Sequence, residues 1–236
     1  YPSGYCFHIF IEVRCLLIRL TINSIDAFNF EKESLMAKNT KNQILAQGDE
    51  DEQQIIPLDG ISLNTLGAHL LFGEVNTTSV YQAVNFIIKS NFVFDHDTQL
   101  TMIVNSPGGS VSDGFALIDV METSRLDITT VGIGQVASMG VLIVSAGTKG
   151  KRVITKNTEI MAHQFSTMVY GKYHELVASQ KYHEQLEKMF IKHFMKHTTM
   201  TEKQVKDIMF SPTDRWLTPA EAKKYGICDE VREHMI

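Results

Sequence analysis

The chain has 236 residues, of which 44% are hydrophobic and 21% are charged, and its formal net charge is −5. This composition is typical of one globular domain with a sizeable core, and the acidic balance excludes the broad basic surface that nucleic-acid binding requires. The cysteines Cys6, Cys15 and Cys228 have no spacing typical of a metal site. We therefore expect a reducing environment without structural disulfides.

The first 66 residues differ from the rest of the chain. Residues 5–22 are apolar but interrupted by Glu12, Arg14 and Arg19, so they match neither a membrane span nor a secretory signal. We expect residues 1–35 to be an extension outside the fold, with Met36 as the natural start. Residues 36–66 are polar and contain an acidic run, which is typical of a flexible solvated segment. The folded domain is expected to cover residues 67–236.

Strand and helix patterns alternate along the folded part of the chain. Residues 69–75 and 100–104 read as strands, and helical patterns follow them at 79–89 and 111–123. Ser110 or Ser112 can cap the second of these helices. Repeated units of this kind predict an α/β layered architecture.

Ser138 lies on a predicted turn between a strand and a helix. Residues 129–134 form a β-branched, glycine-punctuated run, and residues 139–146 form a short apolar run that reads as a buried helix. A serine at such a turn presents its hydroxyl beside the free N–H groups of the helix start, as a nucleophile requires. The alternative is a serine that simply caps the helix.

A nucleophilic serine needs a base, an orienting acid and donors for the oxyanion. His163 ends an apolar run that reads as a strand, Asp214 follows farther along, and Gly108 with Gly109 ends the strand before Val111. A histidine among apolar residues can also be a hydrogen-bonded core residue. Several other aspartates compete with Asp214: Asp113, Asp119, Asp127, Asp207 and Asp229.

Five stretches of this chain, in this order, resemble the ClpP family, the proteolytic subunits of ATP-dependent Clp proteases and a serine peptidase family (S14). They are residues 103–109, 134–140, 146–152, 160–164 and 214–222. The resemblance covers about residues 67–233. It implies a ClpP/crotonase-like spiral of ββα units, with a protruding handle helix that interlocks two rings.

The resemblance also implies the roles of the site residues. Ser138 matches the nucleophile, His163 the general base and Asp214 the orienting acid, while Gly109 and Met139 match the two oxyanion-hole donors. It implies that the chain needs no metal and no organic cofactor. It also implies a partner that uses ATP, an AAA+ unfoldase such as ClpX or ClpA. The implied substrates are unfolded polypeptides, and the implied assembly is a cytoplasmic homo-oligomer of two stacked heptameric rings, with axial loops in the region of 36–66.

Four features depart from the family pattern. Phe165 replaces the usual proline after the His-Gln pair, and residues 166–171 replace a glycine-rich turn. Lys156 replaces the proline usual before the histidine strand, and the span from His163 to Asp214 is slightly longer. We expect these changes to alter the geometry that receives the substrate strand.

Residues 173–196 form a long helical pattern that needs a surface to cover its apolar side. That side carries Leu176, Val177, Leu186, Met189, Phe190 and Phe194. The same helix holds His193 and His197 four residues apart, a spacing that zinc sites use. No third ligand is near them in the sequence, so we expect no metal there. After it, Thr218, Pro219 and Glu221 form a capping box that starts a short helix ending at Gly226.

The leading hypothesis is a serine endopeptidase acting inside an oligomeric chamber. The chain lacks a phosphate-binding loop of its own, so ATP hydrolysis is assigned to the unfoldase. The alternatives are a virus-encoded or specialised protease with a narrower processing role, a crotonase-like acyl-CoA enzyme, and a non-catalytic ring subunit. The presence of Ser138, His163 and Asp214 together argues against the last two.

Overall fold

The computed structural model describes residues 43–45, 55–57, 62–166 and 169–233. It separates into two units, Tyr1–Gly60 and Ile61–Ile236, which are described individually. In the first unit, β1 (Gln43–Leu45) and β2 (Ile55–Pro57) pair as antiparallel strands. The expected extension over 1–35 and the expected start at Met36 lie outside the described residues.

The second unit is built on a seven-stranded sheet among its described residues. Five strands run parallel in the order β3 (Ala68–Phe72), β4 (Leu100–Ser106), β5 (Ile128–Ala137), β6 (Arg152–Thr155) and β9 (Glu230–Arg232). The strand β7 (Glu159–Ala162) also pairs in parallel with β5, at the last three residues of β5, and β8 (Arg215–Leu217) pairs antiparallel with β7. Strand β5 therefore joins the parallel strands β3, β4, β6 and β9 to the pair β7 and β8.

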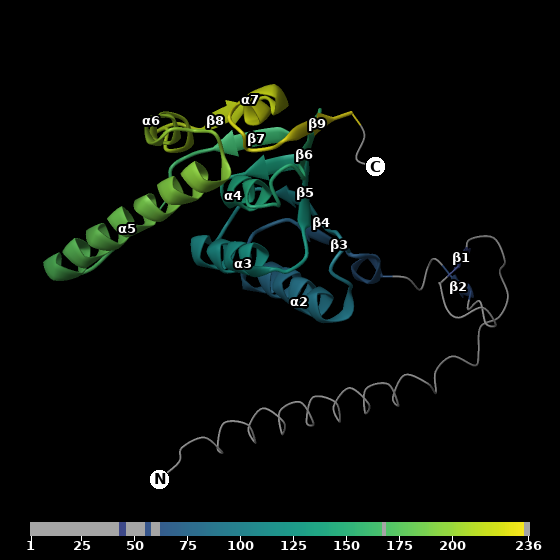
Figure 1. The fold of residues 1–236 in the computed structure, drawn as a ribbon. Coiled ribbons are helices and arrows are strands. Elements are labelled where there is room, and N and C mark those ends of the chain that lie inside the picture. The colour runs from purple at the N-terminus through teal and green to yellow at the C-terminus, as the bar shows by residue number, and fades with distance from the viewer. Residues whose placement is uncertain (1–42, 46–54, 58–61, 167–168, 234–236) are drawn as a thin grey trace, which may run out of the picture. The chain divides into compact units, whose positions relative to one another are not determined.

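Helices follow the strands in the order that the sequence predicts (Figure 1). They are the 3-10 turn η2 (Leu63–Leu66), α2 (Thr77–Val93), α3 (Val111–Thr123), α4 (Met139–Ser145), α5 (Tyr173–His197), α6 (Glu202–Gln204), the π-helical turn η3 (Val205–Met209) and α7 (Pro219–Lys224). The α/β class is confirmed, and the alternation of parallel strands and helices agrees with repeated strand–helix units.

Helix α2 shows how the amphipathic helices are fixed to the sheet. Asn76 caps its N-terminus in a capping box with Ser79. Its buried residues, Val80, Ala83, Phe86, Ile87 and Ser90, recur at helical spacing and so form one stripe against the core.

Helix α4 is different, because all seven of its residues are buried. An all-apolar segment of this length is stable only when neighbouring elements surround it, and α4 contacts β4, β5, α3 and α5. The strand that leads into it changes direction at Gly134, where φ is +59°. Glycine reaches this conformation without steric cost.

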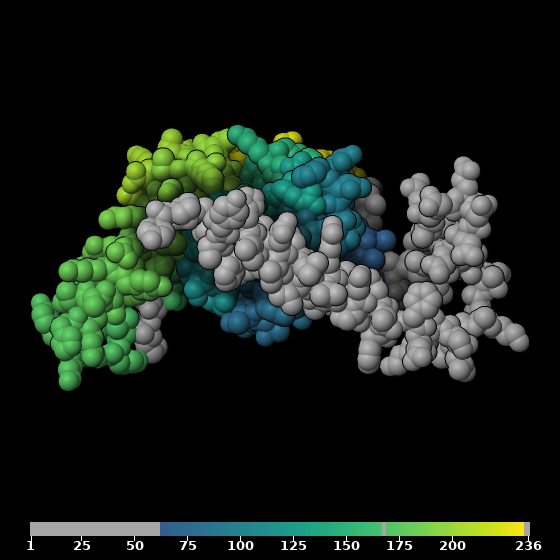
Figure 2. Space-filling model, turned by 60° about the horizontal axis from the view of Figure 1, so that its bottom comes forward, coloured from purple at the N-terminus to yellow at the C-terminus, as the bar shows by residue number. Residues whose placement is uncertain are grey.

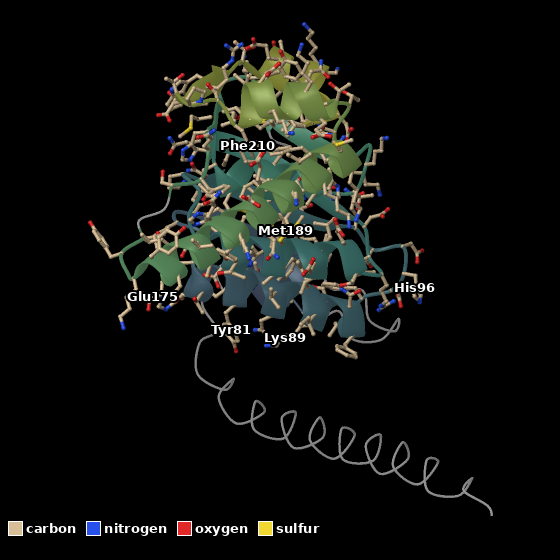
Figure 3. The ribbon with its side chains drawn as sticks, turned by 90° about the vertical axis from the view of Figure 1, so that its left-hand side faces the viewer. Tyr81, Lys89, His96, Glu175, Met189 and Phe210 are labelled. Carbon is tan, nitrogen blue, oxygen red and sulfur yellow. The ribbon has the colours of Figure 1, made fainter. Side chains whose placement is uncertain are left out.

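Helix α5 extends away from the sheet and its covering helices (Figure 1), and its first half protrudes in the space-filling view (Figure 2). Figure 3 shows Glu175 near the protruding end and Met189 farther along the helix. The expected apolar side is therefore only partly covered. Leu186, Phe190 and Phe194 are buried, whereas Leu176 and Met189 are 43% and 45% exposed.

The C-terminal helix begins as predicted. The side chain of Thr218 accepts a hydrogen bond from the Glu221 N–H, Pro219 occupies the first turn, and Gly226 has a positive φ after the helix end. Within the residues that the structure describes, no helix is long and apolar enough to cross a membrane.

Candidate active site

Ser138 lies at a turn with a strained backbone and is half-buried. Of the described residues other than glycine, it alone has a positive φ, at 52°. It occupies the N-cap position of α4, but its side chain makes no capping hydrogen bond. The simple capping role is therefore wrong, and the hydroxyl is available for chemistry. Such strain is found mainly where function requires it.

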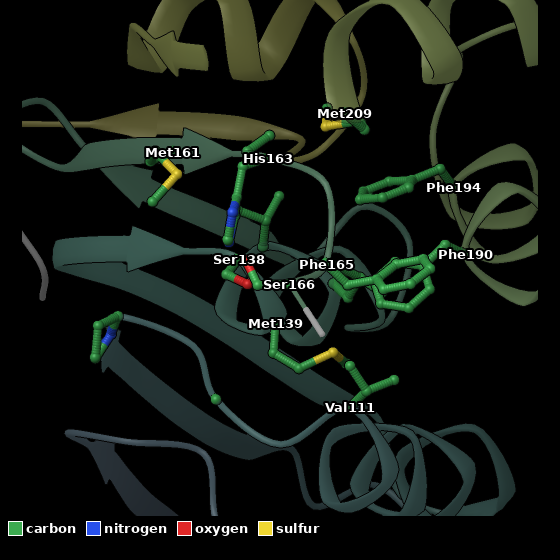
Figure 4. Close-up of a pocket in the computed structure, with 15 residues that line it drawn as sticks. Val111, Ser138, Met139, Met161, His163, Phe165, Ser166, Phe190, Phe194 and Met209 are labelled. Carbon is green, nitrogen blue, oxygen red and sulfur yellow. The ribbon is translucent and has the colours of Figure 1, made fainter. Parts of the chain in front are cut away.

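The pairing of β5 with β7 places Ser138 beside His163. Ala137 is paired with Met161, and the Ser138 N–H donates to the Met161 carbonyl at 2.8 Å. His163 follows β7 directly and is half-buried. Figure 4 shows its side chain next to Ser138 on the same side of a pocket.

Asp214 approaches His163 from the antiparallel strand. Ala162 is paired with Arg215 at the end of the β7–β8 ladder, and the residues next to this pair are His163, which follows β7, and Asp214, which precedes β8. Asp214 is exposed and is not among the residues that line the pocket. Within the described residues, no hydrogen bond joins Ser138 to His163 or His163 to Asp214. Catalytic hydrogen bonds are often long in the absence of substrate.

Gly108 packs directly behind Ser138. A Cβ added to Gly108 would lie 2.6 Å from the Ser138 Cβ and 3.0 Å from the Met139 nitrogen. The φ of Gly108 is +96° and that of Gly109 is +149°, both in the range that favours glycine. The Gly108–Gly109 turn can approach the serine this closely only because it lacks side chains.

Two backbone donors near Ser138 have no partner among the residues that the structure describes. Met139 is the first residue of α4, so its N–H has no acceptor within the helix. The N–H of Gly109 makes no hydrogen bond with the described residues, although Val75 binds the backbone on both sides of it. Both residues line the Ser138 pocket.

The pocket has a volume of about 340 Å³ and is largely apolar. Its walls include Val111, Met139, Met161, Ala162, Phe165, Phe190, Phe194 and Met209. The rings of Phe165 and Phe190 lie 5.8 Å apart, and both also contact Phe210. The sequence assigned Phe190 and Phe194 to the apolar side of a handle, whereas the structure has them lining this pocket.

Glu122 is a possible third metal ligand beside His193 and His197 of α5. Glu122 of α3 lies beside His193 and His197, and one ligand atom of each lies within 4.8 Å of the others. The sequence could not show this, because Glu122 belongs to a distant element. The lack of a third ligand is thus no longer an argument against a metal site.

Comparison with known proteins identifies relatives. Residues 68–235 match the family described as Clp protease. The chain is 41% identical over 140 residues to the ATP-dependent Clp protease proteolytic subunit 2 of Thermobifida fusca, an alignment that covers 58% of this chain and 66% of that protein. The subunit 2 of Corynebacterium diphtheriae is 39% identical over 140 residues, covering 59% and 69%.

A third relative is the ATP-dependent Clp protease proteolytic subunit 3 of Streptomyces avermitilis, which is 37% identical over 137 residues. That alignment covers 58% of this chain and 62% of the relative. The chain thus spans about two thirds of the length of the relatives it matches.

Proposed function

The chain belongs to the Clp protease family of serine endopeptidases, and from this membership we propose that it hydrolyses peptide bonds with Ser138 as nucleophile. The observation that carries the assignment is the turn at Ser138. Its φ of 52° exposes an unbonded hydroxyl in a pocket that His163 also lines. This combination is what acyl transfer needs from a protein.

In the first step, the Ser138 Oγ attacks the carbonyl carbon of the substrate and His163 accepts the hydroxyl proton. The bond that forms makes a tetrahedral intermediate with a negative oxygen. His163 then returns the proton to the leaving amine as the C–N bond breaks, and water hydrolyses the acyl-serine by the reverse sequence of proton transfers. Asp214 orients His163 and stabilises its charged form.

The N–H groups of Gly109 and Met139 are proposed to bind the negative oxygen. Neither has an acceptor in the described part of the chain, and both are held by rigid elements, the Gly108–Gly109 turn and the start of α4. One donor of this kind contributes about 3 kcal/mol to transition-state stabilisation. The reaction requires no metal and no organic cofactor from the protein.

The pocket indicates which side chain the enzyme prefers before the cleaved bond. Its aromatic and methionine walls favour an apolar side chain, and the described residues that line it include no aspartate, glutamate, lysine or arginine. A volume of about 340 Å³ accommodates a large residue. We expect cleavage after large apolar residues.

Proteins of this family act as oligomers with Clp ATPases. For this chain, we propose a cytoplasmic homo-oligomer of two stacked heptameric rings that receives unfolded polypeptides from an AAA+ unfoldase such as ClpX or ClpA. The protruding half of α5, with Leu176 and Met189 exposed, supports a ring-to-ring contact. ATP hydrolysis would belong to the unfoldase.

The test is Ser138→Ala, assayed with a fluorogenic peptide and with a fluorophosphonate probe that phosphonylates active serines with loss of fluoride. We expect hydrolysis and labelling to be lost while the particle mass stays the same. Ser112→Ala, a serine outside the pocket that bonds Ser110, is the matched control and should retain both. Full turnover by Ser138→Ala would refute the assignment.

A further inference from the structure

A second group of reactive side chains lies between α3 and α5. It consists of Glu122, His193 and His197, and one ligand atom of each lies within 4.8 Å of the other two. None of the three lines the Ser138 pocket, so peptide hydrolysis as derived above makes no use of them.

The hydrogen bonds of His193 favour the tautomer that has its lone pair on Nδ1, where a cation can bind. Its Nε2 lies 3.1 Å from the carbonyl oxygen of Leu142 and 3.0 Å from the hydroxyl of Ser145. Because the Leu142 carbonyl only accepts and the Ser145 hydroxyl already donates to it, the ring proton sits on Nε2. The lone pair is thus on Nδ1. Metal-binding histidines characteristically donate their other N–H to a carbonyl in this way.

The other two ligands are close together and reachable. The Nε2 of His197 lies 2.6 Å from one carboxylate oxygen of Glu122, so the two ligand atoms are already neighbours. Both residues line a cavity of about 370 Å³ that provides an entry route. The second Glu122 oxygen binds the ammonium of Lys196 at 2.6 Å, but the Lys196 side chain is 56% exposed and can swing into solvent.

We propose that Glu122, His193 and His197 bind one divalent d-block cation, with Zn²⁺ as its best representative. Two imidazole nitrogens and one carboxylate oxygen are a donor set that zinc takes with three protein ligands, leaving one position for water. The cation takes the place of the hydrogen-bond contact between His197 and Glu122. It ties α5 to α3 and has no part in the hydrolysis of the substrate.

The test is isothermal titration of the full-length protein with ZnCl₂ at pH 7.5, after removal of metals with a chelator. We expect one ion per chain and a higher midpoint of thermal unfolding when it binds. Co²⁺ in place of Zn²⁺ should give the visible d–d absorption of a four-coordinate ion.

Two variants assign the ligands. Glu122→Gln and His197→Gln should each lower the affinity for Zn²⁺ at least about tenfold. His174→Gln, an exposed histidine on the same helix, is the matched control and should leave the affinity unchanged. Equal affinity in the wild type and in both ligand variants would mean that Zn²⁺ binds elsewhere, and the proposal would be wrong.

A third variant separates a metal site from an ion-pair network. Lys196→Gln removes the cation that competes for Glu122, so it should raise the affinity for Zn²⁺ several-fold. Unchanged or weaker binding in Lys196→Gln would also count against the proposal. None of these measurements depends on peptide hydrolysis, so their failure would leave the role of Ser138 untouched.

Discussion

Ala162 is paired with Arg215 across β7 and β8, and His163 and Asp214 are the residues next to this pair. If Asp214 orients His163, Asp214→Asn should lower kcat for a peptide substrate about 10⁴-fold, because the amide favours the wrong histidine tautomer. The measurement is steady-state hydrolysis with active sites counted by a serine-directed probe. The matched control is Asp207→Asn, an exposed aspartate on η3, which should retain normal turnover. Equal rates for the two variants would assign the orienting role to another acid.

Gly108→Ala should damage the site through a direct clash. The new methyl group would lie 2.6 Å from the Ser138 Cβ, so the glycine turn must move away from the nucleophile. We expect kcat to fall at least about 10²-fold, as displacements of this kind do.

The control for Gly108→Ala is Gly150→Ala. Gly150 also has a positive φ, +87°, but no atom lies within 4 Å of its added Cβ. Both variants should lose about 1–2 kcal/mol of stability from the backbone strain alone. Only Gly108→Ala should lose activity, and equal activities would show that the close approach is not needed.

Phe165 is expected to limit the size of the side chain that the pocket accepts. It lines the cavity and packs against the rings of Phe190 and Phe210. Phe165→Ala should enlarge the pocket and raise the ratio of kcat/KM for tryptophan over leucine before the cleaved bond by about tenfold. Phe92→Ala, which removes an 85% exposed ring from α2, should leave that ratio unchanged. An unchanged ratio in Phe165→Ala would mean that the substrate side chain binds elsewhere.

The exposed apolar residues of α5 should govern ring-to-ring assembly. Leu176→Glu together with Met189→Glu should lower the particle mass measured by light scattering, because two charges would enter the contact. Leu176→Ile with Met189→Leu keeps the surface apolar and should keep the mass. Phe190 and Phe194 are unsuitable for this test because they line the pocket. Full-sized particles from the glutamate variant would place the contact elsewhere.

Local signals in the sequence predicted much of the fold. The helix expected at 111–123 has the bounds of α3, and the Ser110 side chain caps it as anticipated. The helix expected at 79–89 begins two residues earlier and ends later, because the Asn76 capping box sets its start. The strand expected at 69–75 ends at Phe72, since Gly73 turns the chain with a φ of +84°.

Relationships between distant elements were the part that the sequence could not supply. The pattern placed Phe190 on an apolar helix side, but which surface it meets depends on how α5 packs against Phe165 and Phe210. Glu122 reaches His193 and His197 for the same reason, through the packing of α3 against α5. Ser138 and His163 could be proposed from sequence because each directly follows a strand, and neighbouring parallel strands end at the same edge.

The buried His193 should make the stability of the protein depend on pH. Burial lowers its pKa from 6.5 to about 3 in the folded state, so the unfolded chain binds a proton there between these values while the folded chain does not. Stability is therefore greatest above pH 6.5 and falls as the pH is lowered. Between pH 7.5 and 5.5 this residue alone should remove about 1 kcal/mol from the free energy of unfolding.

His193→Gln keeps a donor for the Leu142 carbonyl and cannot titrate, so the free energy of unfolding of this variant should fall less over the same pH interval, by that amount. Urea unfolding at both pH values, with a chelator present, measures the difference, and identical pH dependence in the two proteins would show that folding does not lower the pKa of His193.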